Sequence, residues 1–313
     1  MAKKTVLKFN RNAPQTWEDA LQEFLWYKQA EGISETTAND YRTHISMFYK
    51  SFPAAYEEEQ LKRSVLEYMA KPAKPAYYNL KLIYLRAFFN WSVKEGIYCS
   101  NPLTGFKKRK ADGRVVNLTE ESLRKLLSLP DKSTFAGLRD YTIFLISLDT
   151  GIRPKELFSL IPSDFNLRSL EVNVRSEISK TRSSRSLPLS PATAKAVRDL
   201  IAARHKSWDE NTPVFCTIDG IMLSRSTWGK RMVEYSKKLG VKICPYFLRH
   251  AFALQFLRNG GHALALQRTL GHSDLSMTKR YIALTESDIR LQHHKASPLN
   301  KLIPKRNRVR KVT

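Results

Sequence analysis

Cysteine is scarce in this chain of 313 residues, and long apolar runs are missing from it. The three cysteines, Cys99, Cys216 and Cys244, are widely spaced. Such spacing is typical of neither a disulfide framework nor a zinc site. No apolar run approaches the roughly 18 residues that cross a bilayer, and Met1–Asn10 lacks the apolar stretch of a signal peptide. The sequence therefore predicts a soluble, cytoplasmic protein with no membrane partner.

Acidic residues are also few, at 29 against 53 lysines and arginines, which leaves a net charge of +24. Each Lys or Arg that contacts a phosphate releases condensed counterions, so this surplus favours a polyanionic partner. The hydrophobic fraction of 42% is large enough for a buried core, which argues against wholesale disorder. We therefore expect a folded protein that binds nucleic acid.

The positive charge is unevenly distributed along the chain. Residues 15–106 carry ten basic and eleven acidic side chains. Residues 1–14 and 301–313, at the two ends of the chain, carry basic side chains and no acidic ones. The charged, glycine-containing stretch Lys107–Arg114 is typical of a linker, with a solvated loop inside one domain as the alternative. The run KRNRVRK near the C-terminus is either a disordered nucleic-acid arm or a solvated end. We expect a basic extension, a first domain, a basic linker, a second domain and a basic tail, over residues 1–14, 15–106, 107–116, 117–292 and 293–313.

Hydrophobic periodicity predicts a mainly α-helical fold with a small β-sheet or hairpin in the second domain. Thr16 and Ser34 are expected helix N-caps, and Gly96 is an expected left-handed helix end. Four helices are expected in the first domain, over residues 16–32, 34–50, 58–70 and 77–96. In the second domain we expect a helix start at Leu118–Glu121, a hairpin built from LRSLEVNVR and RSLPLS, and helices over Phe135–Asp149, Ala192–Arg204, Trp228–Leu239, Phe247–Asn259, Ala263–Leu270 and Leu275–Leu284.

Candidate nucleic-acid contacts in the first domain lie on two expected helices and beside them. Ordinary solvated helix faces are the alternative, and sequence does not separate base contacts from phosphate contacts. The candidates are Thr36, Thr37, Asn39 and Arg42, then Lys71, Lys74, Lys81 and Arg86 in or beside a stretch without acidic residues, and Lys107, Lys108, Arg109 and Lys110 of the linker.

Arg153 stands where an arginine is unfavourable unless an anion is near. In TGIRPKEL, Gly151 ends one helix and Pro154 starts another, so the Arg153 cation meets the positive end of a helix dipole. An anion shared by the guanidinium and the free backbone N–H groups would explain this placement. Exposure to water, or pairing with Asp149 or Glu156, explains it about as well.

Two further segments repeat this kind of placement. Pro245 leads into a helix that carries Arg249 and then His250, and a glycine turn delivers His272. Tyr281 follows nine residues later, on the expected last helix. Each signal is weak alone, because a lone histidine is usually structural and a helical tyrosine is usually part of the core.

Together these residues form an ordered pattern. Arg153 in TGIRPKEL, Lys180 in SKTRSSRSLPLS, Arg249 in YFLRHAFA, His272 in LGHSDLS and Tyr281 in MTKRYIAL resemble the signature of the tyrosine recombinases, the phage-integrase family. The spacings from Arg249 to His272 and Tyr281, 23 and 32 residues, are similar to those of Xer-type and phage-type members. The first domain resembles the family's helical, SAM-like core-binding domain more loosely.

The resemblance implies a two-domain DNA clamp that breaks and rejoins DNA strands at specific sites, without metal, ATP or another cofactor. Tyr281 would form a covalent 3′-phosphotyrosine while the 5′-hydroxyl leaves. Arg153, Arg249 and His272 would stabilise the charge on the phosphoryl oxygens.

The resemblance also implies that Lys180 protonates the leaving 5′-oxygen. Arg182 and Arg185 compete with it locally, and binding of all three side chains to backbone phosphates is the alternative. Tyr246 departs from the family pattern, which usually has histidine three residues before the second arginine. A phenol can donate to a phosphoryl oxygen but is a poor base near neutral pH. His250 is not an obvious substitute.

The family implies double-stranded recombination sites as partners and a homotetramer on two sites. It leaves room for accessory DNA-bending or directionality factors, and it implies a nucleoid-associated location. Residues 285–299 would be exchanged between protomers. The short extension, residues 1–14, favours an Xer-like or mobile-element integrase without a folded arm-binding domain. A type IB topoisomerase-like activity and a non-catalytic DNA-binding descendant of the family remain as alternatives.

Overall fold

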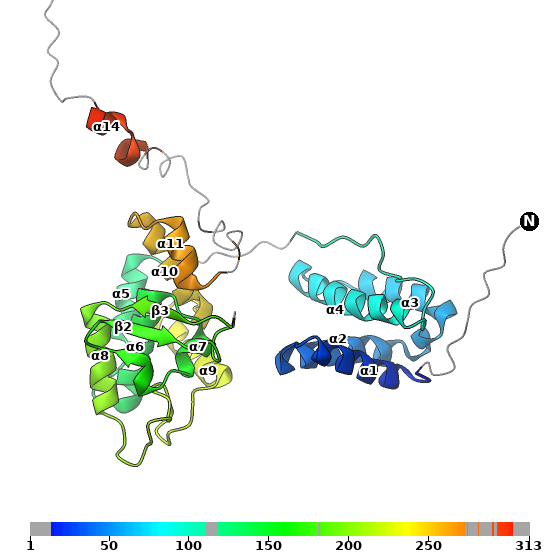
Figure 1. Ribbon diagram of the computed structural model, residues 1–313, viewed down its shortest axis with the longest axis horizontal. Helices are drawn as coiled ribbons and strands as arrows, with labels where there is room; N and C mark the ends of the chain where they lie inside the picture. Colours follow the sequence, from blue (N-terminus) through cyan, green and yellow to red (C-terminus); the bar gives the residue numbers. More distant parts are fainter. Residues whose placement is uncertain are drawn as a thin grey trace, which may run out of the picture. The chain divides into compact units, whose positions relative to one another are not determined.

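The computed structural model describes residues 14–110, 118–180, 182–272, 274, 281, 290 and 293–302. The chain divides into two compact units, Met1–Gly113 and Arg114–Thr313. Both are mainly helical, and the second also holds a three-stranded antiparallel sheet (Figure 1), which confirms the predicted fold class. No helix in the described ranges is long and apolar enough to cross a membrane.

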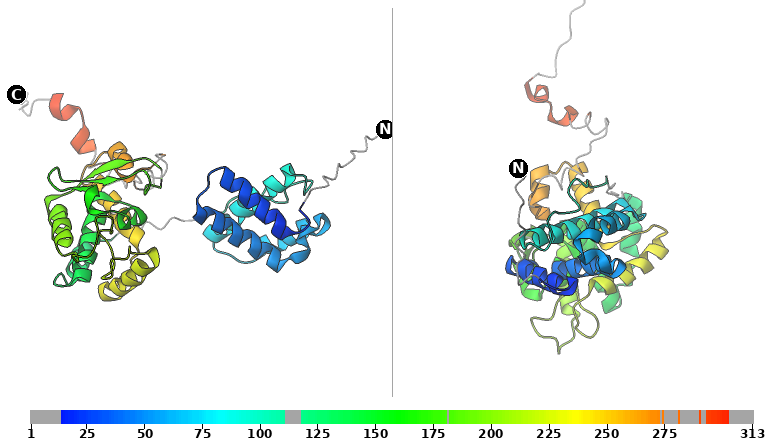
Figure 2. Two further views of the ribbon diagram at one scale, coloured as in Figure 1. Left: turned by 60° about the horizontal axis from the view of Figure 1, so that its bottom comes forward. Right: turned by 90° about the vertical axis from the view of Figure 1, so that its right-hand side faces the viewer.

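The described part of the first unit, residues 14–110, is a bundle of four α-helices. They are α1 (Trp17–Ala30), α2 (Glu35–Ser51), α3 (Glu58–Ala70) and α4 (Pro75–Lys94), with a short 3-10 helix at Pro53–Tyr56. Helix α1 packs on α2 and α4, and α2 packs on α4 (Figure 2). The hydroxyls of Thr16 and Ser34 accept the backbone N–H groups of Asp19 and Thr37, so both predicted N-caps are confirmed.

Aromatic rings fill the core of this bundle. Phe24, Phe48, Phe88 and Phe89 are fully buried, and their rings meet mostly edge to face. Each fully buried ring stabilises the fold by roughly 1.5–3 kcal/mol relative to an exposed one. The bundle therefore has a rigid core, which leaves the outer helix faces available for polar and basic side chains.

The second unit builds its core around α6. Its elements are α5 (Glu120–Ser128), α6 (Phe135–Thr150), α7 (Pro154–Phe158), a 3-10 helix (Pro162–Asp164), β1 (Phe165–Asn166), β2 (Glu171–Val174), β3 (Arg185–Pro188), α8 (Pro191–Ala202), α9 (Arg225–Leu239), α10 (Pro245–Arg258), α11 (Ala263–Leu270) and α14 (Leu299–Leu302). Helix α6 packs against both α8 and α10. Strand β2 pairs antiparallel with β1 and with β3. The helix expected over Leu275–Leu284 lies outside the described residues, apart from Tyr281.

Gly151 brings three helices together at one point. It ends α6 with a φ of 62°, a left-handed conformation that favours glycine. A Cβ atom here would lie 2.3 Å from the Phe252 ring of α10 and 2.7 Å from the Leu270 side chain of α11. Only glycine fits this contact, and it places the start of α7 beside α10 and α11.

Candidate active site

A buried carboxylate joins two of the candidate arginines. Arg153 caps α7 and donates to Oε1 of Glu156 at 2.9 Å, while Arg185 at the start of β3 donates to Oε2 at 2.5 Å. Glu156 is only 1% exposed. Burial acts to raise the pKa of Glu156, but the hydrogen bonds and charges of Arg185 and Arg153 outweigh it and lower that pKa. Glu156 is therefore an ionised carboxylate that fixes both guanidinium groups.

Arg249 is held by backbone carbonyls at the ends of two helices. It is 5% exposed, and it donates to the carbonyls of Gly151 at 2.6 Å and Leu270 at 2.7 Å. Arg153 donates in the same way to the carbonyl of Gly271 at 2.8 Å. Burial, with the charge of Arg153, lowers the pKa of Arg249 to about 10, so this guanidinium remains cationic at neutral pH.

His272 directly follows Gly271, the left-handed end of α11. Its Nε2 lies 3.0 Å from the Arg249 guanidinium. Burial and the charges of Arg249 and Arg153 lower the pKa of His272 to about 4, so the ring is neutral at pH 7. A neutral ring that accepts at Nε2 has its proton on Nδ1, where it can still donate to a ligand.

The hydroxyl of Tyr281 lies beside α10. It is 2.5 Å from Nδ1 of His250, and the two ring centroids are 5.6 Å apart. The Tyr281 ring packs against the apolar cluster of α10 and α11 that contains Phe252 and Leu270. The structure therefore brings Tyr281, Arg249 and His272 into one site and adds His250, which the sequence analysis set aside.

The sequence analysis assigned no role in the site to Glu156 or His250, although each lies close in sequence to a candidate arginine. Glu156 lies three residues after Arg153, and pairing with it or with Asp149 was an alternative to a bound anion, but nothing singled Glu156 out over Asp149. The structure settles the choice, because the Asp149 carboxylate accepts the backbone N–H of Ser190 instead. His250 directly follows Arg249, but the direction of its ring depends on packing around α10 that sequence does not show.

Three other candidates are exposed. Lys180 lies in the turn between β2 and β3, and its backbone N–H is 3.5 Å from Oε1 of Glu156. Arg182, in the same turn, is exposed and has a positive φ of 51°. Tyr246 is the second residue of α10 and is 45% exposed, one turn before Arg249. Arg185 differs from Lys180 and Arg182, because it is fixed inside the cluster.

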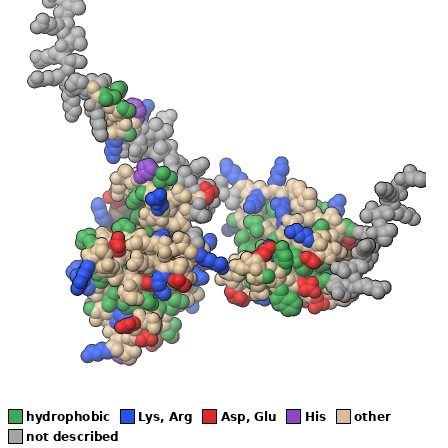
Figure 3. Space-filling model, in the orientation of Figure 1, with side chains coloured by type: hydrophobic (Ala, Val, Ile, Leu, Met, Phe, Trp, Pro, Cys, Tyr) green, Lys and Arg blue, Asp and Glu red, His purple; other side chains and the backbone are tan. Residues whose placement is uncertain are grey.

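Most candidates of the first unit lie at its surface. Lys and Arg side chains gather along one edge of this unit (Figure 3). Arg86 is half-buried and donates to the carbonyls of Leu103 and Phe106, and the Arg109 guanidinium lies 3.8 Å from the centroid of the Tyr78 ring. Thr37 is half-buried, and the exposed candidates are Thr36, Asn39, Arg42, Lys71, Lys74, Lys107, Lys108, Arg109 and Lys110.

Lys81 differs from the expectation of an exposed DNA contact. Its side chain is 3% exposed, and its ammonium donates to the carbonyl of Tyr68 at 3.0 Å and lies 4.3 Å from the centroid of that ring. Lys81 stands on the α4 face that also buries Tyr78 and Leu85. It links α3 to α4, and its ammonium is buried inside the bundle rather than exposed to DNA.

The net charge of the cluster formed by Arg153, Arg185, Arg249, Glu156 and His272 suits a bound phosphate. Three guanidinium groups, one carboxylate and a neutral imidazole leave a net charge of +2 before the exposed Lys180 is counted. A phosphodiester carries one negative charge, and further charge develops on its oxygens when a nucleophile attacks. Donors that are already fixed stabilise that charge by several kcal/mol, because they need no reorganisation.

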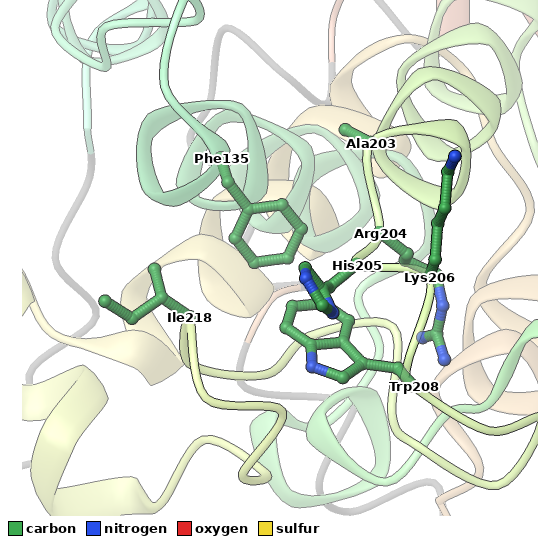
Figure 4. Close-up of a pocket in the computed structure, with 7 residues that line it drawn as sticks. All are labelled: Phe135, Ala203, Arg204, His205, Lys206, Trp208 and Ile218. Atoms are coloured by element: carbon green, nitrogen blue, oxygen red, sulfur yellow. The ribbon is translucent and has the colours of Figure 1, made fainter.

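A separate pocket of about 590 Å³ lies elsewhere in the second unit (Figure 4). The rings of Phe135 and Trp208 meet there edge to face at 5.3 Å, beside Ile218 and residues 203–206. No residue of the arginine cluster lines this pocket. In the part of the chain that the structure describes, no three His, Cys, Asp or Glu side chains gather as a metal site requires.

Comparison with known proteins identifies relatives of both units. Residues 116–288 match the phage integrase family. The tyrosine recombinase XerD of Listeria monocytogenes serotype 4b (strain F2365) is 31% identical over 295 residues, which cover 88% of this chain and 98% of that protein.

Two solved structures share the fold. The Tn1549 transposon integrase in complex with transposon right end DNA has a TM-score of 0.72 at 19% identity, covering 89% of this chain and 99% of that chain. A lambda integrase dimer bound to a COC′ core site has a TM-score of 0.69 at 18% identity, covering 84% and 94%. Both likenesses extend across the helical and the sheet-containing units.

Proposed function

This chain belongs to the phage integrase family and is a tyrosine site-specific recombinase, and on that basis we propose that Tyr281 is its nucleophile. The single observation that carries the proposal is the position of the Tyr281 hydroxyl. It lies in the same site as Arg249 and His272, and an adjoining carboxylate fixes Arg153 and Arg185. A phenol that attacks here meets a phosphate already surrounded by fixed cationic donors.

In the proposed reaction, Oη of Tyr281 bonds to the scissile phosphorus and the bond from phosphorus to the 5′-oxygen breaks. The phosphoryl oxygens accept hydrogen bonds from Arg153 and Arg249, each of which the backbone already orients. Lys180 supplies the proton that the leaving 5′-oxygen takes. The DNA 3′ end stays on the tyrosine until another 5′-hydroxyl attacks and releases it, so the bond energy is retained.

The first unit supplies the second half of the proposed DNA contact. Its exposed cations include Lys71 and Lys74, which flank the connection between α3 and α4, and the segment Lys107–Lys110. Such cations bind the duplex backbone and position the scissile phosphate. We propose that the two units together clamp a double-stranded recombination site, with Arg42 and Asn39 of α2 also facing the DNA.

Strand exchange between two duplexes requires four nucleophiles, one for each strand, so we propose a homotetramer on two sites. Accessory DNA-bending or directionality factors would then act on the DNA or on this tetramer. Sedimentation of the protein with and without a duplex site distinguishes monomer, dimer and tetramer.

Covalent trapping tests the nucleophile. Wild type and Tyr281→Phe are incubated in EDTA, without ATP, with a nicked suicide duplex taken from DNA that flanks the coding region. A denaturing gel should show a protein–DNA adduct with wild type and none with Tyr281→Phe. An adduct that persists in Tyr281→Phe would contradict the assignment, and tight binding in a gel shift without any adduct would favour a non-catalytic DNA-binding protein.

A further inference from the structure

His250 lies in direct contact with the hydroxyl of the proposed nucleophile, Tyr281. The hydroxyl and Nδ1 are 2.5 Å apart, within the reach of direct proton transfer. His250 stands on α10, whose position is fixed by the contact of Gly151 with Phe252 and by the Arg249 hydrogen bonds. The imidazole is therefore supported by a packed helix rather than by a loop.

Arg249, His272 and Tyr246 are poor proton acceptors. Arg249 is cationic, and it already donates to two carbonyls and towards Nε2 of His272. The Nε2 of His272 is engaged by that arginine, and the surrounding cations disfavour a second proton on the ring. Tyr246 is exposed at the start of α10, and a neutral phenol is a poor base.

We propose that His250 accepts the proton of Tyr281 during DNA cleavage, an inference that rests on the proposed function. In the neutral ring the proton sits on Nε2, and Nδ1 accepts a hydrogen bond from the phenol. As Oη bonds to phosphorus, the O–H bond breaks and the proton moves to Nδ1, while the bond to the 5′-oxygen breaks and that oxygen takes a proton from Lys180. On rejoining, a 5′-hydroxyl gives its proton to Lys180 as its oxygen bonds to phosphorus, while the phosphorus–Oη bond breaks and the imidazolium returns the proton to Oη.

A purely positional role for His250 makes a different prediction, and asparagine separates the two. The amide of asparagine can take the place of Nδ1 and hydrogen-bond to Tyr281, but it cannot accept a proton. His250→Asn therefore keeps the contact without the base, whereas His250→Ala removes both. A positioning residue would be rescued by asparagine, and a base would not.

The experiment measures single-turnover cleavage of the nicked suicide duplex at saturating protein. General base catalysis contributes about 10²–10⁴-fold, so we expect His250→Ala and His250→Asn both to cleave at least about 10²-fold more slowly than wild type. Imidazole added to His250→Ala should restore part of the rate. His205→Asn is the matched control, because His205 lies beside the separate pocket, and it should cleave at the wild-type rate.

A duplex with sulfur in place of the bridging 5′-oxygen tests whether the slow cleavage of the His250 variants arises at Tyr281 or at the leaving group. When sulfur replaces the bridging 5′-oxygen, the leaving thiolate needs no proton, so the defect of Lys180→Ala should largely disappear while that of His250→Asn persists. Wild-type rates in both His250 variants, recovery of His250→Asn to the wild-type rate, or relief of its defect by sulfur would each overturn the inference. Failure of wild type itself to form an adduct would instead overturn the proposed function.

Discussion

The two units of this protein use their cations in opposite ways. In the helical unit most candidate cations are exposed, and Arg109 lies against an aromatic ring. In the catalytic unit, Arg153, Arg185 and Arg249 are nearly buried and are fixed on one carboxylate and four helix-end carbonyls. Exposed cations stay hydrated, so their attraction to DNA phosphates weakens as salt concentration rises. Fixed, buried cations can stabilise the negative charge that develops on a phosphate only in the transition state.

The largest effect is expected where the fixed cations lose their carboxylate. Glu156→Gln leaves Arg153 and Arg185 buried beside a neutral amide, which should lower the free energy of unfolding by about 3 kcal/mol and the cleavage rate by at least about 10²-fold. Denaturant titration and suicide-substrate cleavage measure the two losses. The matched control is Glu120→Gln, since Glu120 pairs with Arg124 at the exposed surface and should cost below about 0.5 kcal/mol. If Glu120→Gln lost as much stability and cleavage rate as Glu156→Gln, the difference between buried, fixed arginines and exposed ones would be contradicted.

An intermediate effect is expected from the exposed cations of the helical unit. Lys71→Ala combined with Lys74→Ala should weaken DNA binding and reduce the slope of log affinity against log salt by about 2, since each phosphate contact contributes about 0.9. Cleavage at saturating protein should stay within about threefold of wild type, because these side chains stabilise ground state and transition state equally. Fluorescence anisotropy at several salt concentrations provides the slope.

Lys81→Met is the matched control for that pair within the same unit. Its ammonium is engaged with Tyr68, so the substitution should change the melting temperature and leave the salt slope unchanged. A reduced slope of log affinity against log salt in Lys81→Met would show that this buried lysine contacts DNA, which would contradict the assignment of Lys81 to the packing of the bundle.

Much of the fold followed from local patterns. The helices at Glu58–Ala70 and Ala263–Leu270 were predicted to the residue, and the cap at Thr16 followed from its spacing to Asp19. These features depend on neighbours three or four positions away, which sequence displays directly.

The direction of individual side chains could not be predicted in the same way. Lys81 was expected to contact DNA because it lies in a stretch without acidic residues, yet its stem packs inside the bundle and its ammonium donates to the carbonyl of Tyr68. The partner of Arg153 stayed open between two carboxylates until the packing of α7 selected Glu156. The His250 contact depends on how α10 packs near Tyr281, which residue spacing alone does not specify.

The smallest effect is expected from the titration of His272. Its folded-state pKa of about 4 lies below the ordinary value near 6.5, so the unfolded chain binds more protons between these two values. The free energy of unfolding should therefore fall as pH decreases from about 6.5 to 4, by about 1–2 kcal/mol from this residue. His272→Asn should flatten that part of the curve in thermal melts, and an unchanged curve would contradict a buried neutral ring.

The most direct measurement identifies the amino acid that carries the DNA. The trapped adduct is digested with nuclease and trypsin, and the peptides are analysed by mass spectrometry. Cleavage after Arg280 and Arg290 releases the peptide YIALTESDIR, in which Tyr281 is the sole tyrosine. The account predicts a residual nucleotide on Tyr281 of this peptide. A nucleotide on Tyr246, or on any other residue, would contradict the central claim that Tyr281 is the nucleophile of this arginine cluster.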